Sequence, residues 1–219
     1  MQTVPETQLI QFEDWTLRVR ESEDQSAKLL LLVHGLTGDE NSMWVFARDL
    51  PANYWIIAPR APHTVDPGGY SWRPSQLGNL DTMRLDWLRQ SAEALIGLVD
   101  TYSASVGIDA SVFDVMGFSQ GAALCNVLTF LYPQRVRKAG ILAGFVPNGL
   151  EELVSQRPLE GKPFFVAHGT KDETVTVESA RASIALLEKA GAHVTYCEDE
   201  VAHKVSMKCL RILKRFLTD

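Results

Sequence analysis

The chain has 219 residues, a length that fits one α/β domain spanning residues 1–219. Hydrophobic residues make up 46% of it, and 21 basic residues against 27 acidic ones leave a formal net charge of −6. This charge balance argues against a nucleic-acid partner, and no apolar run reaches the roughly 20 residues of a membrane span. We therefore expect a soluble protein without an integral membrane segment.

The first third of the chain predicts strands separated by short connections. Residues 8–20 alternate apolar and polar side chains, which indicates one or two antiparallel edge strands. The continuous apolar run over residues 28–33 is typical of a central parallel strand covered on both faces. A loop at residues 34–38 leads to a predicted helix over residues 41–49, and a second buried strand follows at residues 55–58.

Residues 59–78 form the longest irregular stretch and are rich in proline and glycine. A loop of this length inside a compact domain is usually functional or disordered. Its aromatic residues, Tyr70 and Trp72, favour an ordered loop that faces a ligand. The alternative is that these aromatic side chains only anchor the loop to the core.

Strands and helices alternate through the rest of the chain. Predicted helices cover residues 81–103, 122–131, 177–190 and 206–217, and predicted strands cover residues 112–116, 139–143, 164–167 and 193–197. This alternation indicates a mostly parallel central sheet with helices on both faces.

Cysteine usage bears on the compartment. Cys125, Cys197 and Cys209 are odd in number and form no C-x-x-C motif, which argues against a disulfide framework and favours a reducing cytosol. The N-terminus shows no signal-peptide pattern, so we expect a cytoplasmic location. Cys125 is expected to be a packed apolar residue.

The sequence G-F-S-Q-G at residues 117–121 lies between a predicted buried strand and a predicted helix. This context matches the nucleophile elbow, in which a tight strand-to-helix turn exposes the serine hydroxyl. Side chains two residues before and after the serine would collide, and Gly117 and Gly121 remove them. We predict Ser119 as a nucleophile; the alternative is an ordinary serine in a glycine-rich turn.

A serine nucleophile needs a base and an acid that orients the base. Functional groups gather at the carboxyl ends of parallel strands, where His203 and Asp172 are predicted to lie. Four other carboxylates compete with Asp172 on position alone: Glu173, Glu198, Asp199 and Glu200. Two further histidines at strand ends, His34 and His168, are expected to brace their loops by hydrogen bonding.

Acyl transfer also needs donors for a tetrahedral oxyanion. The backbone N–H of Gln120, directly after the nucleophile, is one expected donor. The N–H of Leu36, in the loop after an earlier strand, is the other.

Six segments, in order along nearly the whole chain, resemble the phospholipase/carboxylesterase family of α/β hydrolases, small enzymes related to acyl-protein thioesterases. They are H-G-L-T-G-D at 34–39, G-G-Y-S-W at 68–72, G-F-S-Q-G at 117–121, A-G-F-V-P at 143–147, H-G-T-K-D-E-T-V at 168–175 and A-H at 202–203. The resemblance implies the α/β-hydrolase fold, a catalytic triad and an oxyanion hole. The residues implied are Ser119, Asp172 and His203 for the triad and Leu36 and Gln120 for the hole.

The resemblance also implies that Tyr70, Trp72, Phe145 and Val146 line the acyl groove. The chain departs from the family pattern at Ala202, where glycine is common, and at Thr176, where proline is common. Neither residue replaces a reacting group, so these departures bear on substrate detail. The short connection over residues 148–162 leaves material for only a minimal lid.

We therefore expect a carboxylesterase that cleaves small carboxylic esters through an acyl-enzyme. Acyl-thioesterase or lysophospholipase activity is the alternative within the family, and a non-catalytic binding protein that retains the fold is the alternative outside it. Nucleotide binding is disfavoured because residues 34–38 lack the G-x-G-x-x-G spacing. We expect no cofactor and no metal, and a homodimer that partly covers the groove is possible.

Overall fold

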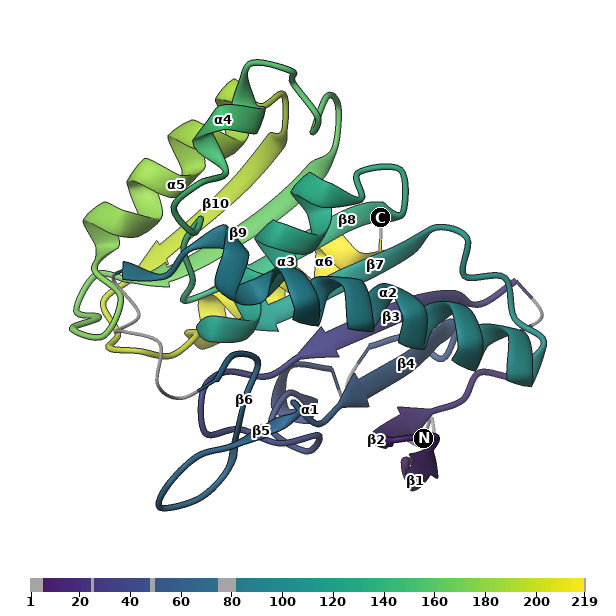
Figure 1. The fold of residues 1–219 in the computed structure, drawn as a ribbon. Coiled ribbons are helices and arrows are strands. Elements are labelled where there is room, and N and C mark those ends of the chain that lie inside the picture. Colours follow the sequence, from purple (N-terminus) through teal and green to yellow (C-terminus); the bar gives the residue numbers. More distant parts are fainter. Residues whose placement is uncertain (1–5, 25, 48–49, 75–81, 219) are drawn as a thin grey trace.

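A computed structural model describes residues 6–24, 26–47, 50–74 and 82–218 (Figure 1). Eight strands form one sheet in the order β1-β2-β4-β3-β7-β8-β9-β10. The strands of this sheet are β1 (Gln8–Phe12), β2 (Trp15–Arg20), β3 (Lys28–Val33), β4 (Tyr54–Pro59), β7 (Phe113–Phe118), β8 (Val136–Leu142), β9 (Pro163–Gly169) and β10 (His193–Asp199). Strands β1 and β2 pair antiparallel, as does β2 with β4, whereas all pairs from β4 to β10 are parallel.

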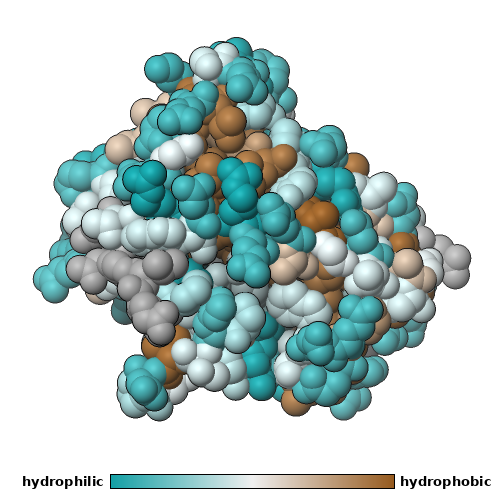
Figure 2. Space-filling view, in the orientation of Figure 1, coloured by the Kyte–Doolittle hydropathy of each residue, from teal (hydrophilic) through white to brown (hydrophobic). Residues whose placement is uncertain are grey.

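Helices cover both faces of this sheet, as predicted. They are α1 (Trp44–Ala47), α2 (Leu85–Val106), α3 (Gln120–Leu131), α4 (Glu151–Val154), α5 (Val177–Lys189) and α6 (Met207–Thr218). Figure 1 shows α2 and α3 in front of the strands and α6 behind them. In the same orientation, Figure 2 shows a mostly hydrophilic surface in which hydrophobic residues appear in patches.

The central strand β3 explains why two layers of helices are needed. Its alternate residues Leu29 and Leu31 belong to the core shared with α2 to α5, whereas Leu30 and Leu32 belong to the core shared with α1 and α6. All four side chains are fully buried. A strand that is apolar on both faces must be covered on both, and this accounts for the continuous run of leucines.

Some predicted elements differ in extent. The stretch expected to be irregular contains a short antiparallel hairpin, β5 (His63–Thr64) and β6 (Tyr70–Ser71). Helix α1 is shorter than expected, and the predicted helical residues 48–49 and 81 lie outside the described residues, as do residues 75–78 of the predicted loop. Helix α4 was not predicted, because four residues carry too little periodicity to show a helix.

The prediction against a disulfide was wrong, because Cys197 in β10 and Cys209 in α6 form one. Cys125 is free and buried, as expected for a packed apolar residue. Nothing in the separation of 12 residues between Cys197 and Cys209 indicates the pairing, which arises because α6 packs back against the end of β10. The disulfide removes the cysteine-based argument for a reducing compartment. Within the described part of the chain, no helix is both long and apolar enough to cross a membrane.

The disulfide closes the segment between β10 and α6, and we expect it to stabilise the fold. Replacing both partners (Cys197→Ser with Cys209→Ser) should lower the free energy of unfolding by about 2–3 kcal/mol, because the unfolded chain regains the entropy of that loop. Urea denaturation in buffer without a reductant measures the change.

A thiol reductant provides the internal control. It should lower the stability of the wild type toward that of the double variant and leave the double variant unchanged. Equal stabilities of the two proteins without reductant would show that the bridge contributes nothing.

Candidate active site

Ser119 occupies the tight turn between β7 and α3. Its backbone angles are φ 53° and ψ −117°, a sparsely populated region that costs about 1–3 kcal/mol for a residue with a side chain. A Cβ atom on Gly117 would lie 2.3 Å from the carbonyl oxygen of Gly121, and one on Gly121 would lie 2.1 Å from that of Val33. Both glycines are therefore required, as the sequence indicates, and they place Ser119 at the start of α3.

Asp172 and His203 come together from two neighbouring strand ends. The Nδ1 atom of His203 lies 2.7 Å from Oδ2 of Asp172, whose side chain is fully buried, while that of His203 is 24% exposed. A neutral imidazole that donates Nδ1–H to this carboxylate has its lone pair at Nε2. That is the tautomer a general base requires.

The Asp172 carboxylate is held by its own loop. Its Oδ1 accepts hydrogen bonds from the backbone N–H groups of Thr174 and Val175, at 2.9 and 3.0 Å. His168 is buried beside it, with Nε2 2.8 Å from the carbonyl oxygen of Val175 and 3.4 Å from Oδ2 of Asp172. His168 thus braces this loop, as the sequence suggests.

The four competing carboxylates are placed differently. Glu198 is bound by Arg181 and by the Tyr196 hydroxyl, and these hydrogen bonds lower its pKa to about 2. Glu200 pairs with Lys171 at the surface. Among the described residues, neither of these two carboxylates, nor Asp199, nor the exposed Glu173, is hydrogen bonded to His203. Asp172 is therefore the carboxylate that pairs with it.

Ser119 lies on the same rim as the Asp172–His203 pair. Phe118, the residue before it, places its ring 5.0 Å from the imidazole of His203 between centroids. Across the described residues, no hydrogen bond joins the Ser119 hydroxyl to His203. Such contacts are often long in unliganded active sites and tighten with substrate.

His34 organises the loop expected to supply one oxyanion donor. Its Nε2 accepts the backbone N–H of Ala61 at 3.0 Å, so Nδ1 carries the proton and donates to the carbonyl oxygen of Gly35 at 2.7 Å. Burial lowers the pKa of His34, which keeps it in this neutral form. Because the carbonyl and N–H of one peptide point in opposite directions, anchoring the Gly35 oxygen also sets the direction of the Leu36 N–H.

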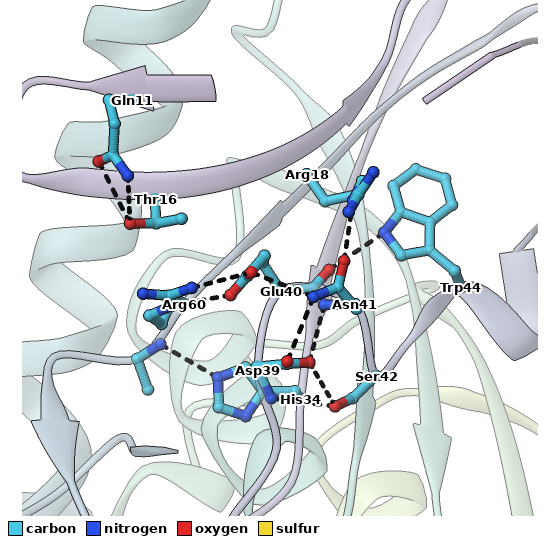
Figure 3. A network of polar contacts seen from close by, with 11 residues as sticks. Gln11, Thr16, Arg18, His34, Asp39, Glu40, Asn41, Ser42, Trp44 and Arg60 are labelled. Atoms are coloured by element: carbon cyan, nitrogen blue, oxygen red, sulfur yellow. Dashed lines mark hydrogen bonds and ion pairs between the residues drawn. The ribbon is translucent and has the colours of Figure 1, made fainter. Parts of the chain in front are cut away.

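An ion pair between the buried Glu40 and the half-buried Arg60 supports the other side of this loop (Figure 3). The carboxylate of Glu40, which is 2% exposed, is held by two hydrogen bonds from Arg60, at 2.8 and 3.0 Å. These bonds lower the pKa of Glu40. The guanidinium of Arg60 also lies 4.7 Å from the centre of the Tyr70 ring.

The two aromatic residues of the long loop have different environments. Tyr70 is half-buried, whereas Trp72 has no exposed surface. The indole N–H of Trp72 donates to the carbonyl oxygen of His34 at 2.8 Å. Trp72 therefore anchors the loop to the core, and the expectation that it lines a groove is corrected.

Phe145 and Val146 line a cavity of about 290 Å³ at the carboxyl end of the sheet. Its other lining residues are Met83, Asn148, Val175, Thr176 and Ser179. Val175 belongs to the loop that holds Asp172, so the cavity adjoins the acid of the proposed triad. Apolar side chains line the cavity together with the amide of Asn148 and the hydroxyl groups of Thr176 and Ser179.

Sequence reasoning did not identify Glu40, Arg60 or the side chain of Gln120 as part of the site. The Glu40–Arg60 pair spans 20 residues, and the Gln120 side chain reaches back 48 residues to Trp72. Each partner alone is an ordinary polar residue, so no local pattern would have found them.

Comparison with known proteins gives a consistent family. The family model described as Phospholipase/Carboxylesterase matches residues 16–219. The chain is 28% identical to acyl-protein thioesterase 1 of Debaryomyces hansenii over 93% of this chain and 95% of that protein. A 106-residue segment is 31% identical to carboxylesterase SOBER1 of Arabidopsis thaliana, covering 47% and 46% of the two chains.

Solved structures agree on the fold. A carboxylesterase from Mesorhizobium loti superposes with a TM-score of 0.79 at 21% identity, covering 97% of this chain and 98% of that one. The Bacillus cereus carboxylesterase gives a TM-score of 0.78 at 21% identity and covers 94% of both chains. The chain therefore has the α/β-hydrolase fold.

The buried state of His34 predicts a pH dependence of stability. The pKa of His34 is lowered from 6.5 in the folded protein, so below about pH 6.5 the unfolded chain binds a proton that the folded chain does not. The neutral His34 therefore contributes fully to the free energy of unfolding above its pKa in the unfolded chain. This contribution is lost as the pH falls through its lower pKa in the folded protein. The fall in the free energy of unfolding from pH 7.5 to pH 5.5 should therefore be smaller in His34→Asn than in the wild type, by urea denaturation.

Between pH 7.5 and pH 8.5, His34 is neutral in both the folded and the unfolded wild type. The free energy of unfolding should therefore change by the same amount in the wild type and in His34→Asn. A wild-type decrease at low pH that the variant reproduces in full would contradict the neutral, buried His34.

Proposed function

The chain belongs to the phospholipase/carboxylesterase family, and from this premise we propose that it is a serine hydrolase acting on small carboxylic esters. The observation that carries the proposal is the part-buried Asp172–His203 hydrogen bond on the rim that presents a strained Ser119. Relatives named carboxylesterase and acyl-protein thioesterase support a carboxylic ester hydrolase.

In the proposed reaction, the Ser119 oxygen attacks the ester carbonyl carbon while Nε2 of His203 accepts the hydroxyl proton. The carbonyl oxygen becomes an oxyanion, which accepts hydrogen bonds from the N–H groups of Leu36 and Gln120. The imidazolium then donates its proton to the leaving alcohol as the ester C–O bond breaks. Asp172 stabilises the imidazolium throughout.

Deacylation reverses these roles with water. His203 accepts a proton from a water molecule whose oxygen attacks the acyl-enzyme, and then returns a proton to Ser119 as the carboxylic acid leaves. Each oxyanion donor typically contributes about 3–4 kcal/mol to the transition state. The same steps serve a thioester, so acyl-thioesterase activity is the second candidate, favoured by the full-length similarity to an acyl-protein thioesterase.

We assign the acyl part of the substrate to the cavity that Phe145 and Val146 help to line. A volume of about 290 Å³ lies at the small end of ligand pockets, which favours short acyl groups over long lipid chains. The cytoplasmic location stays a prediction, and the Cys197–Cys209 bridge weighs against it because disulfides are rare in a reducing cytosol.

The triad predicts where covalent labelling occurs. A fluorophosphonate should modify Ser119 in the wild type, located by peptide mass spectrometry, and Ser119→Ala should be neither labelled nor active.

Asp172→Asn should lower kcat about 10³–10⁴-fold, because the carboxylate that fixes the imidazole tautomer is lost.

Glu173→Gln is the matched control, since it neutralises the adjacent, exposed carboxylate of the same loop. It should keep wild-type kcat. A folded wild type that resists the probe, or equal losses in the two carboxylate variants, would refute this assignment.

Cavity size predicts chain-length selectivity. Across p-nitrophenyl esters from acetate to palmitate, kcat/KM should be highest for short acyl groups. Ser179→Leu places a larger side chain at the cavity wall, so the preferred chain should become shorter still. Acyl-thioesters of the same lengths, assayed in parallel, decide between the two leaving groups.

Glu178→Leu is the control for this variant, because Glu178 is exposed in the same helical turn and does not line the cavity. It should keep the wild-type profile. A profile that Ser179→Leu leaves unaltered would place the acyl group elsewhere.

A further inference from the structure

We propose that the side chain of Gln120 is a positioning group that holds the two proposed oxyanion donors in register. The inference rests on the proposed function, in which the N–H groups of Gln120 and Leu36 bind the same oxygen atom. Gln120 contributes its own N–H directly. Its side chain acts on Leu36 indirectly, through β6.

The amide of Gln120 is fully buried and is held by Ser71 of β6 and by Trp72, the residue that follows β6. Its Oε1 accepts the backbone N–H of Trp72 at 2.9 Å, and its Nε2 donates to the Ser71 hydroxyl oxygen at 3.1 Å. That hydroxyl donates in turn to the carbonyl oxygen of Arg73 at 2.7 Å. Its proton is therefore used, and the Ser71 oxygen is left to accept.

These partners fix which way the amide points. The backbone N–H of Trp72 can only donate, and the Ser71 hydroxyl, whose proton is used and whose oxygen also accepts the Arg73 N–H at 3.2 Å, can only accept from the amide. The oxygen of Gln120 therefore faces Trp72 and its nitrogen faces Ser71. A carboxylate would place a second acceptor against Ser71, and an apolar side chain would satisfy neither group. The chemistry of the site therefore selects an amide.

The same short segment holds the loop of the other donor. The N–H of Thr37 donates to the carbonyl oxygen of Tyr70, and the N–H of Tyr70 donates to that of Gly38, both at 3.0 Å. The indole of Trp72 adds its hydrogen bond to the carbonyl oxygen of His34. These bonds fix the loop on both sides of Leu36.

Leu36 itself is left available. Its N–H has no hydrogen-bond partner among the described residues, although both neighbouring peptides are held. Thr37 has a positive φ of 65°, a conformation that the surrounding bonds must maintain. Buried hydrogen bonds therefore join Gln120 to residues 71–72, and the N–H of Thr37 joins the adjacent carbonyl oxygen of Tyr70 to the peptide after Leu36.

A buried amide could also contribute to stability alone, and the two roles differ in what they change. A stabilising role lowers the melting temperature without affecting turnover by the folded enzyme. A positioning role lowers kcat with little effect on KM, because an oxyanion exists only after attack has begun. Misplacement of a donor by about 1 Å can cost around 100-fold in rate.

The experiment compares Gln120→Leu, Ser71→Ala and Tyr54→Phe with the wild type on a short p-nitrophenyl ester. Gln120→Leu should lower kcat about 100-fold with KM within roughly twofold. Ser71→Ala removes one of the two contacts and should lower kcat roughly threefold to tenfold. A trifluoromethyl ketone, which forms a tetrahedral adduct with serine, should lose affinity in proportion to kcat/KM.

Tyr54→Phe is the control for lost stability. It removes a buried hydroxyl that bonds Asp114 and the Leu217 carbonyl oxygen at the opposite end of the sheet. This variant should melt at a lower temperature and keep wild-type kcat.

Unchanged kcat in folded Gln120→Leu, or in Ser71→Ala if the first variant does not fold, overturns the inference while the proposed function stands. A fall in kcat in Tyr54→Phe equal to that in Gln120→Leu also overturns it, because lost stability would then explain both. A wild type that neither hydrolyses esters or thioesters nor reacts with the fluorophosphonate contradicts the proposed function itself.

Discussion

The close approach of backbones around Ser119 is the constraint on which the site depends. The chain turns from β7 into α3 so tightly that Gly117 and Gly121 nearly touch, and the end of β3 lies against Gly121. Ser119, the proposed nucleophile, lies in this turn and has a strained backbone. Such strain persists only where the surroundings over-determine it, and here two buried strands and a buried helix do so.

The proposed acid and base meet through a second close approach of the same kind. A Cβ atom on Gly169, at the end of β9, would lie 2.1 Å from the carbonyl oxygen of Val201 in the loop after β10. That contact brings together the loops that carry Asp172 and His203, although 31 residues separate the two side chains. The parallel register of β9 and β10 then determines which loop residues face each other. A side chain on Gly169 would move the base away from its acid without touching either group.

Local features of the sequence predict the parts of this arrangement that local physics creates. The elbow glycines and the leucine run of β3 express requirements within a few residues of the chain. The buried position of Trp72, the Cys197–Cys209 bridge and the amide contacts of Gln120 depend instead on packing between distant segments. Neither composition nor spacing records such contacts, and a buried tryptophan and a ligand-facing one look alike in a loop. The short hairpin of β5 and β6 escapes prediction for the same reason, since two residues per strand carry no periodicity.

The two sides of the proposed site differ in how firmly they are held. On the oxyanion side, His34, Gln120 and Glu40 are almost fully buried, and each makes at least two hydrogen bonds with fixed donor and acceptor roles. On the base side, His203 is partly exposed and, among the described residues, is hydrogen bonded to Asp172. This difference suits the chemistry. An oxyanion is stabilised best by dipoles that need no reorganisation, whereas the base must exchange protons with serine, leaving group and water in turn. In the proposed mechanism, the most firmly held groups therefore lie where charge would develop, and the partly exposed group lies where protons would be transferred.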